Sequence, residues 1–233
     1  MLKIENLNTG YDKKQILFEV SFEIMQGDIA LLVGSNGSGK STLLKSIFGI
    51  CKVWQGNIIF NNENITNKQS NYLIQKGLMY IPQKNNVFEQ LTVKENLEIS
   101  GLVLNNKTLY KQRYEQLMED FKMLKPFLDK HPMKMSGGER QQLVLAMAML
   151  HQPKLLLIDE PFTGLSPQAI ADISTKIMEV NKYNNTTILM VEHRIKEALS
   201  LAKQVLGLKL GKVVQNTAEI SNFTNEFFQQ ILI

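Results

Sequence analysis

The sequence predicts an α/β fold with a mainly parallel sheet, and three observations carry this prediction. Short apolar runs, typical of strands that are buried on both faces, occur at 28–33, 155–158 and 188–191. Stretches with helical patterning alternate with these runs, and such alternation favours a parallel, doubly wound sheet. Between about 84 and 150 the pattern is mainly helical, which predicts an insertion into that core.

The N-terminal elements follow from the spacing of the apolar residues. Residues 1–33 largely alternate apolar and polar side chains, a period of two that predicts β-strands. A glycine-rich loop follows the run at 28–33, and residues 43–50 then predict a helix. Thr92 and Glu95 have the spacing of a capping box, so we expect the first helix of the insertion to begin there.

The remaining elements continue this alternation. Residues 107–130 are rich in charge and predict a further helix of the insertion, and 168–180 predict a helix between two buried strands. A hairpin is expected around Gly211. We expect one domain over residues 1–233. Its parts are a core with a β subdomain at 1–83 and 151–215, a helical subdomain at 84–150 and a C-terminal tail at 216–233.

Composition and charge exclude several classes of protein. The chain has 233 residues, of which 44% are hydrophobic and 21% charged, an ordinary globular balance. Its longest apolar run is about eight residues, whereas a transmembrane helix needs roughly twenty. The N-terminus lacks a signal-peptide pattern and Cys51 is the single cysteine, so we expect a cytoplasmic protein without disulfides. The net charge of +4 comes from scattered lysines with few arginines, so we expect no nucleic-acid partner.

The strongest local signal is the segment Gly34–Ser41, which fits the pattern G-x-x-x-x-G-K-[ST]. Its glycines allow the backbone to wrap around a phosphate group, and N–H groups of the loop and the following helix point at the anion. Lys40 would reach the β- and γ-phosphates, and the Ser41 hydroxyl would bind Mg²⁺. A plain glycine turn is the alternative, and the strand before the loop and the helix after it argue against that reading.

A second signal is an apolar strand that ends in Asp159, Glu160 and Pro161. Ligands of open α/β sheets bind outside the carboxyl ends of the strands. Asp159 could hold Mg²⁺ there through a water molecule, and Glu160 could orient or deprotonate an attacking water. Paired acids often only begin a polar loop, so this hypothesis depends on the phosphate loop that the same chain carries.

The segment Met135–Glu139 opens a further predicted helix and allows two interpretations. Ser136 and Glu139 have capping-box spacing, which favours a plain helix N-terminus. Gly137 and Gly138 would also let an anion approach that N-terminus closely, which favours a second anion site. These residues alone do not separate the two interpretations.

Together these motifs resemble the nucleotide-binding subunit of ATP-binding cassette (ABC) transporters. The phosphate loop, the SGGE signature, LLLIDEP and a histidine after a strand occur in the family's order between Tyr11 and His193. A closer similarity, to the branched-chain amino acid importer ATPases, rests on VFEQLTVKENLEI, SGGERQQ, DEPFTGLSP and VEH. The lipopolysaccharide-export ATPase is a second similar group. The resemblance implies a P-loop NTPase core with an N-terminal antiparallel β subdomain and a helical insertion, the ABC ATPase fold.

The resemblance also assigns roles to single residues. Tyr11 matches the aromatic that stacks on adenine, Gln83 the glutamine that contacts Mg²⁺ and the lytic water, and His193 the histidine that contacts the γ-phosphate. The expected catalytic residues are Glu160, His193, Gln83 and Lys40. The expected ATP-binding residues are Tyr11, Gly34, Ser35, Asn36, Gly37, Ser38, Gly39, Lys40, Ser41 and Thr42. The expected Mg²⁺ ligands are Ser41, Gln83 and Asp159, and the signature residues Ser136, Gly137, Gly138 and Glu139 would face the ATP of a second subunit.

Three positions depart from the family pattern. Met135 begins the signature where leucine is usual, an exchange of similar volume that should be tolerated. Glu139 stands where many members have glutamine, although the branched-chain group also uses glutamate. The segment Gly164–Pro167 lacks the aspartate that is common at the end of the dimer-contact loop. Its absence puts in doubt any contact between subunits that depends on this carboxylate.

The resemblance further implies partners and a mechanism. Two copies of this chain, or the chain and a paralogue, would enclose two ATP molecules with Mg²⁺, and ATP binding would drive the dimer to close. Hydrolysis would power transport through separate integral membrane permease subunits, with this chain peripheral on the inner face of the cell membrane. Branched-chain amino acids are the favoured cargo. A lipid or lipopolysaccharide exporter and a soluble ABC ATPase of the iron–sulfur assembly type are the alternatives.

Overall fold

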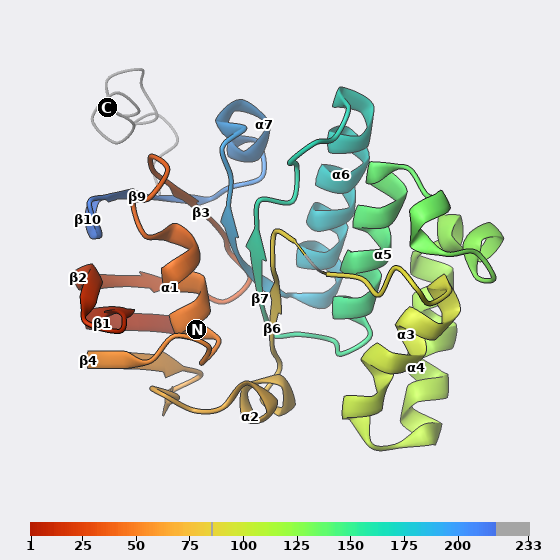
Figure 1. The fold of residues 1–233 in the computed structure, drawn as a ribbon, viewed down its shortest axis with the longest axis horizontal. Helices are drawn as coiled ribbons and strands as arrows, with labels where there is room; N and C mark the ends of the chain where they lie inside the picture. The colour runs from red at the N-terminus through yellow and green to blue at the C-terminus, as the bar shows by residue number, and fades with distance from the viewer. Residues whose placement is uncertain (85, 218–233) are drawn as a thin grey trace.

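The computed structural model describes residues 1–84 and 86–217, which form two sheets and a helical part (Figure 1). Most of the expected tail at 216–233 lies outside the described residues. Within the described ranges, no helix combines the length and the apolar character that crossing a membrane requires. The same ranges contain no group of three or more His, Cys, Asp and Glu side chains that could hold a metal ion.

The N-terminal sheet is antiparallel and has the strand order β2-β1-β4-β5. Burial alternates along the first residues of β1, where Leu2 and Ile4 are buried and Lys3 is exposed, because successive side chains of a strand point to opposite faces. The strands predicted within residues 1–33 and the antiparallel arrangement are confirmed. The strands are β1 (Leu2–Tyr11), β2 (Lys14–Ile24), β4 (Val53–Phe60) and β5 (Glu63–Asn64).

The second sheet has six strands in the order β10-β9-β3-β8-β7-β6, and every neighbouring pair except β10 and β9 is parallel. All residues of β3, β7 and β8 are buried, as their continuous apolar runs predict. The predicted α/β class is confirmed, and so is the hairpin around Gly211. The strands are β3 (Ile29–Val33), β6 (Leu78–Ile81), β7 (Leu155–Asp159), β8 (Thr187–Val191), β9 (Gln204–Lys209) and β10 (Lys212–Thr217).

The parallel sheet separates two hydrophobic cores. On β3, Leu31 and Val33 pack with apolar residues of α5 and α6, whereas Ala30 and Leu32 pack with α1 and the N-terminal sheet. Figure 1 shows α1 between the two sheets and α6 between the parallel sheet and the helical part. The helices outside the insertion are α1 (Lys40–Ile47), α2 (Ser70–Gln75), α6 (Pro167–Asn184) and α7 (Ile195–Leu199).

The helical part contains α3 (Val93–Gly101), α4 (Lys107–Asp120) and α5 (Gly137–Met149). The capping box that the sequence predicts at the start of α3 is present, with Thr92 and Glu95 each bonded to the other's backbone N–H. Short 3₁₀ turns connect these helices. They lie at Leu102–Leu104, Lys122–Phe127 and Pro132–Lys134.

The helix predicted over 107–130 ends earlier than its sequence pattern indicates. Helix α4 stops at Asp120, and the chain continues as a 3₁₀ turn that contains Pro126. Proline has no backbone N–H, and it disfavours the α conformation in the residue before it. Pro126 therefore opposes a regular α-helix within 122–127, and the end of α4 at Asp120 is explained by packing, because Phe121 and Leu124 are buried in the hydrophobic core.

A histidine is buried just beyond the end of α5. His151 is 8% exposed, and its Nε2 lies 3.2 Å from the Ser100 hydroxyl. Burial lowers the pKa of His151, because it disfavours the charged imidazolium. As the pH falls below about 6.5, the unfolded chain takes up a proton here before the folded chain does. The free energy of unfolding therefore decreases as the pH falls through this range.

We predict that His151→Gln makes the thermal stability less sensitive to pH. Glutamine can keep a hydrogen bond to Ser100 but takes up no proton, so the fall in Tm between about pH 7.5 and pH 5.5 should be smaller than in the wild type. The measurement is Tm as a function of pH. His131 is exposed, and His131→Gln is the matched control that should follow the wild type. Parallel curves for the wild type and His151→Gln would contradict the prediction.

Candidate functional site

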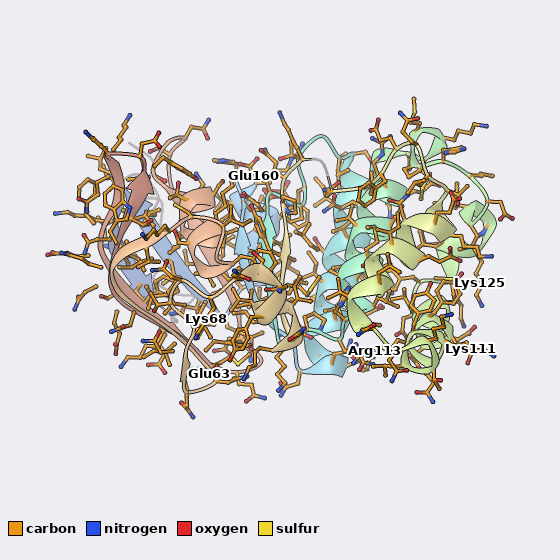
Figure 2. The ribbon with its side chains drawn as sticks, turned by 60° about the horizontal axis from the view of Figure 1, so that its bottom comes forward. Glu63, Lys68, Lys111, Arg113, Lys125 and Glu160 are labelled. Carbon is orange, nitrogen blue, oxygen red and sulfur yellow. The ribbon has the colours of Figure 1, made fainter. Side chains whose placement is uncertain are left out.

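The candidate site lies where four neighbouring strands end. The phosphate loop follows β3, Gln83 follows β6, Glu160 follows β7, and His193 lies two residues after β8. Because β3, β8, β7 and β6 are adjacent and parallel, their carboxyl ends meet at one edge of the sheet. Figure 2 shows Glu160 in the middle of the molecule, between the β subdomain and the helical part.

The phosphate loop has a backbone that requires glycine at particular positions. Gly37 and Gly39 have φ angles of 80° and 107°, which side chains other than glycine rarely adopt. At Gly34 the constraint is space, since a Cβ would lie 2.2 Å from the carbonyl oxygen of Leu208 on β9. The sequence therefore forms a tight loop that leads directly into the N-terminus of α1, where N–H groups can receive an anion.

The Lys40 side chain is folded back into this loop. Its Nζ donates hydrogen bonds to the carbonyl oxygens of Gly34 at 2.8 Å and Ser35 at 3.0 Å. Burial lowers the pKa of Lys40, and the nearby carboxylates of Glu160 and Asp159 oppose that shift. The ammonium group is thus held between the loop and the acidic strand end, where a phosphate could accept its hydrogen bonds instead.

Asp159 offers one oxygen that lacks a protein partner. The residue is 4% exposed, and its Oδ2 accepts a hydrogen bond of 3.3 Å from the Tyr80 hydroxyl, whereas Oδ1 is buried without a partner among the described residues. Burial raises the pKa of Asp159, and a hydrogen bond with the Ser41 side chain opposes this. A carboxylate oxygen beside a serine hydroxyl is a donor set that suits Mg²⁺, so the residues present fit this ion.

Three distant segments of the chain meet at the Glu160 carboxylate. His193 Nε2 lies 3.0 Å from Glu160 Oε1, and Gln83 donates a hydrogen bond through Nε2 to Glu160 Oε2. The backbone of Glu160 has a φ of 52°, a left-handed conformation that costs free energy in a residue other than glycine. The structure thus brings together the three residues that the sequence singled out for contact with the γ-phosphate and its attacking water.

The residues that contact this cluster include three that sequence reasoning missed. Thr163 donates a hydrogen bond of 3.0 Å to Glu160 Oε2, and Tyr80 donates to Asp159. The third is Glu192, which is buried beside His193. Thr163 lies in the segment DEPFTGLSP and Glu192 in VEH, but these segments suggest no role for either residue, because their partners become neighbours only when the sheet forms.

Tyr11 lies at the end of β1, with 45% of its side chain exposed. Its hydroxyl is 3.5 Å from the hydroxyl of Thr42, in the first turn of α1. The aromatic ring therefore stands at the rim of the phosphate loop with much of its surface available for contact. Its expected stacking on adenine stays a prediction.

The signature segment forms the N-terminus of α5. Ser136 accepts a hydrogen bond from the backbone N–H of Glu139, and Glu139 accepts one from that of Ser136, so the predicted capping box is present. A Cβ at Gly138 would lie 2.8 Å from Ala169 Cβ, so this glycine permits close packing against α6. Both roles are local and structural, and the expected contact with a second subunit's ATP stays a prediction.

A groove of about 560 Å³ joins the signature helix to the cluster around Glu160. Gly137, Gln83 and Thr163 all contribute to its walls. A movement of the helical part would therefore alter the surroundings of residues that contact the Glu160 carboxylate.

The other expected site residues, Asn36 and Ser38, lie in the phosphate loop.

The chain is similar to known proteins along nearly its whole length. The family described as ABC transporter matches residues 17–163, which is more than half of the chain. The probable branched-chain amino acid transport ATP-binding protein LivF of Archaeoglobus fulgidus is 36% identical over 231 residues, with 99% of this chain and 98% of that protein covered. The lipopolysaccharide export system ATP-binding protein LptB of Haemophilus influenzae is 31% identical over 217 residues, with 92% and 89% covered.

Solved structures agree with these sequence relatives. The ADP conformation of MJ1267, an ATP-binding cassette of an ABC transporter, has a TM-score of 0.88 and 27% sequence identity, with 99% of this chain and 97% of that chain covered. A nucleotide-free ATP-binding cassette from an ABC transporter has a TM-score of 0.85 at 25% identity, with 99% and 94% covered. The chain belongs to the ABC transporter family, and its fold is that of the family's ATP-binding cassettes.

Proposed function

We propose that this chain binds ATP with Mg²⁺, hydrolyses it, and powers transport through separate membrane permease subunits. The observation that carries the proposal is the meeting of Gln83 and His193 at the Glu160 carboxylate, beside a glycine loop suited to phosphates. The carboxylates of Glu160 and Asp159 raise the pKa of Lys40, which lies in the phosphate loop. This electrostatic interaction supports a single site made of the loop and the acidic cluster. A catalytically inactive binding module would not need this arrangement.

Each residue of the site has a proposed task. Lys40 would exchange its hydrogen bonds to the loop carbonyls for bonds to the β- and γ-phosphates. Glu160 would orient the attacking water and accept its proton, and Gln83 would hold the same water from the other side. His193 would donate a hydrogen bond to the γ-phosphate as negative charge develops there. Most of the catalysis would come from positioning and electrostatic stabilisation.

Ser41, Asp159 and Gln83 are the residues that would hold Mg²⁺. The support for this assignment is the buried Oδ1 of Asp159, which has no partner among the described residues, and the Ser41 side chain, which lowers the pKa of Asp159 against the effect of burial. A bound Mg²⁺ would supply neutralisation of the phosphate charge. The protein's own contribution is to present these oxygens from a rigid strand end and the first turn of α1.

We further propose that two such chains act as a dimer. Each signature segment, Ser136–Glu139, would contact the ATP that is held by the other subunit, so two ATP molecules would lie in the interface. ATP would favour the closed dimer because it would bind that state more tightly than the open one. Loss of the γ-phosphate would remove this preference and allow the dimer to open.

The proposed setting is the inner face of the cell membrane, with branched-chain amino acids as the cargo. Support comes from LivF and from BraG of Pseudomonas aeruginosa, a high-affinity branched-chain amino acid transport ATP-binding protein that is 35% identical over 225 residues, with 97% of this chain and 96% of that protein covered. Similarity to LptB makes lipopolysaccharide export the second candidate. Iron–sulfur assembly is not favoured by these relatives.

We predict that Glu160→Gln keeps ATP binding and loses hydrolysis. Glutamine preserves shape and hydrogen bonding but cannot accept a proton, so kcat should fall by at least about 100-fold. The dissociation constant for ATP should stay within about threefold, since glutamine removes no phosphate contact. Steady-state phosphate release and equilibrium ATP binding measure the two quantities. Glu115 is exposed on α4, so Glu115→Gln is the matched control, and normal turnover by Glu160→Gln would refute the role of Glu160.

We predict that Tyr11→Ala weakens ATP binding and that Tyr11→Phe does not. Stacking of a base on an aromatic ring is worth about 1–3 kcal/mol, so loss of the ring should raise the dissociation constant by about 5-fold to 160-fold. Phenylalanine keeps the ring and loses only the hydroxyl near Thr42, which makes it the matched control. Equilibrium binding of ATP is the measurement. Equal affinities for all three proteins would show that Tyr11 does not stack on adenine.

We predict that the chain copurifies with a polytopic membrane protein after gentle detergent solubilisation of the source membranes. The reason is that the proposed function requires permease subunits, and the described residues contain no helix that could cross a membrane. Mass spectrometry of the captured proteins identifies the partner and thereby its cargo class. Capture of soluble scaffold proteins alone would contradict transport and leave the ATPase assignment intact.

A further inference from the structure

Glu192 is a buried carboxylate that the proposed mechanism does not use. It lies between the end of β8 and His193, and only 2% of its surface is exposed. Burial raises the pKa of Glu192, while three backbone N–H groups that bond to it oppose that shift. A carboxylate is seldom buried so completely unless hydrogen bonds compensate for the loss of water. The contacts of this side chain therefore indicate what it does.

The two oxygens of Glu192 bond to two separate segments of the chain. Oε1 accepts a hydrogen bond of 2.6 Å from the backbone N–H of Phe162. Oε2 accepts bonds of 2.8 Å and 3.0 Å from the backbone N–H groups of His193 and Arg194. One side chain thus connects the turn after Glu160 with the turn that leads into α7. Bonds from N–H groups to a charged oxygen are stronger than neutral ones.

These two turns carry the groups that face each other in the candidate site. Glu160 immediately precedes the first turn, and its Oε1 lies 3.0 Å from His193 Nε2 in the second. Residues 160–164 and 192–194 belong to neither helix nor strand, although the carbonyl oxygen of Arg194 accepts the first hydrogen bond of α7. The N–H of Glu160 does bond to the carbonyl oxygen of Val191 at 2.9 Å, which joins the turns at their base. Glu192 connects the two turns beyond this point, at Phe162 in one turn and at His193 and Arg194 in the other.

We propose that Glu192 is a positioning residue for ATP hydrolysis, because its carboxylate holds these two turns together and keeps His193 aligned with Glu160. This inference rests on the proposed ATPase function. We call the three hydrogen bonds that Glu192 accepts the Glu192 bridge. Phe162 is fully buried in the hydrophobic core, so its end of the bridge is held in a fixed position. His193 is more exposed and follows a strand end, so it is the part whose position the bridge determines.

The bridge requires a carboxylate because all its partners are donors. In a glutamine, one of the two terminal atoms is an NH₂ group, which also donates. Either orientation of the amide therefore sets a donor against a donor, at Phe162 or at His193 and Arg194. An aspartate keeps the charge next to His193 but is shorter by one methylene, so it cannot reach both turns.

The test is the ATPase activity of Glu192→Gln and Glu192→Asp beside the wild type. Displacing catalytic groups by about 1 Å can cost up to about 100-fold, so we expect kcat to fall at least about tenfold in both variants. KM and the dissociation constant for ATP should change far less than kcat, by no more than about threefold, because the phosphate loop and Tyr11 provide most of the expected ATP contacts and His193 provides one, to the γ-phosphate. If Glu192→Gln does not fold, Glu192→Asp decides. Wild-type kcat in a folded Glu192 variant would overturn the inference.

A second measurement separates positioning from general stability. Thr186 directly precedes β8 at the opposite edge of the sheet, and its buried hydroxyl donates a 2.9 Å hydrogen bond to the Pro153 carbonyl oxygen. Thr186→Val should lower Tm by loss of that bond and keep kcat within about twofold. A loss of kcat in Thr186→Val as large as that in Glu192→Gln would show that Glu192 acts only through stability.

A third measurement asks whether Glu192 acts through His193. In a His193→Ala background, Glu192→Gln should change the remaining single-turnover rate by less than about twofold, because the group it positions is gone. If each substitution instead lowers the rate by its own full factor in the double variant, the inference is overturned.

Failure of the proposed function gives a different result, namely a wild type without ATPase activity or a Glu160→Gln variant with normal turnover. An active wild type, an inactive Glu160→Gln and fully active Glu192 variants would refute the positioning role alone.

Discussion

The candidate site depends on the register of the parallel sheet. Hydrogen bonding pairs Asp159 with Val191 and Ile81 with Ile158, so neighbouring strands end within a residue or so of one another. Each functional side chain follows its strand closely, and segments far apart in the sequence therefore converge without a dedicated motif. The His193 imidazole and the Gln83 amide contact the Glu160 carboxylate because β8, β6 and β7 end at the same edge of the sheet.

The two hydrophobic cores keep this register fixed. Leu31 packs on the side of α5 and α6, and Leu32 packs on the side of α1 and the N-terminal sheet. Because side chains alternate along a strand, a slip by one residue would exchange the two sets and leave both cores badly filled. Packing on both faces thus supports the geometry at the strand ends. In the turns beyond those ends Phe162 is still buried in the core but His193 is exposed, and hydrogen bonds that side chains such as Glu192 accept add to the support there.

The sequence predicts what depends on near neighbours, and this covers the buried strands, most helices, the phosphate loop and both capping boxes. It does not predict where α4 ends, because that depends on the burial of Phe121 in the folded core. Nor does it assign a role to Thr163 or Glu192, whose partners become close only in the folded sheet. The sequence therefore predicts the residues of the local motifs, whereas the residues that hold those motifs in position are found only in the tertiary structure.

In the segment Gly164–Pro167, which lacks the family's aspartate, Ser166 can be considered both for its role at the start of α6 and for its place near the proposed subunit interface. Ser166 occupies the N-cap of α6, and its hydroxyl accepts a hydrogen bond of 3.3 Å from the backbone N–H of Ala169. Serine and aspartate are both good N-cap residues, so the start of α6 does not require the carboxylate. What serine removes is a negative charge next to the signature helix. The exchange is therefore neutral for the fold, and any consequence must arise at the proposed interface with a second subunit.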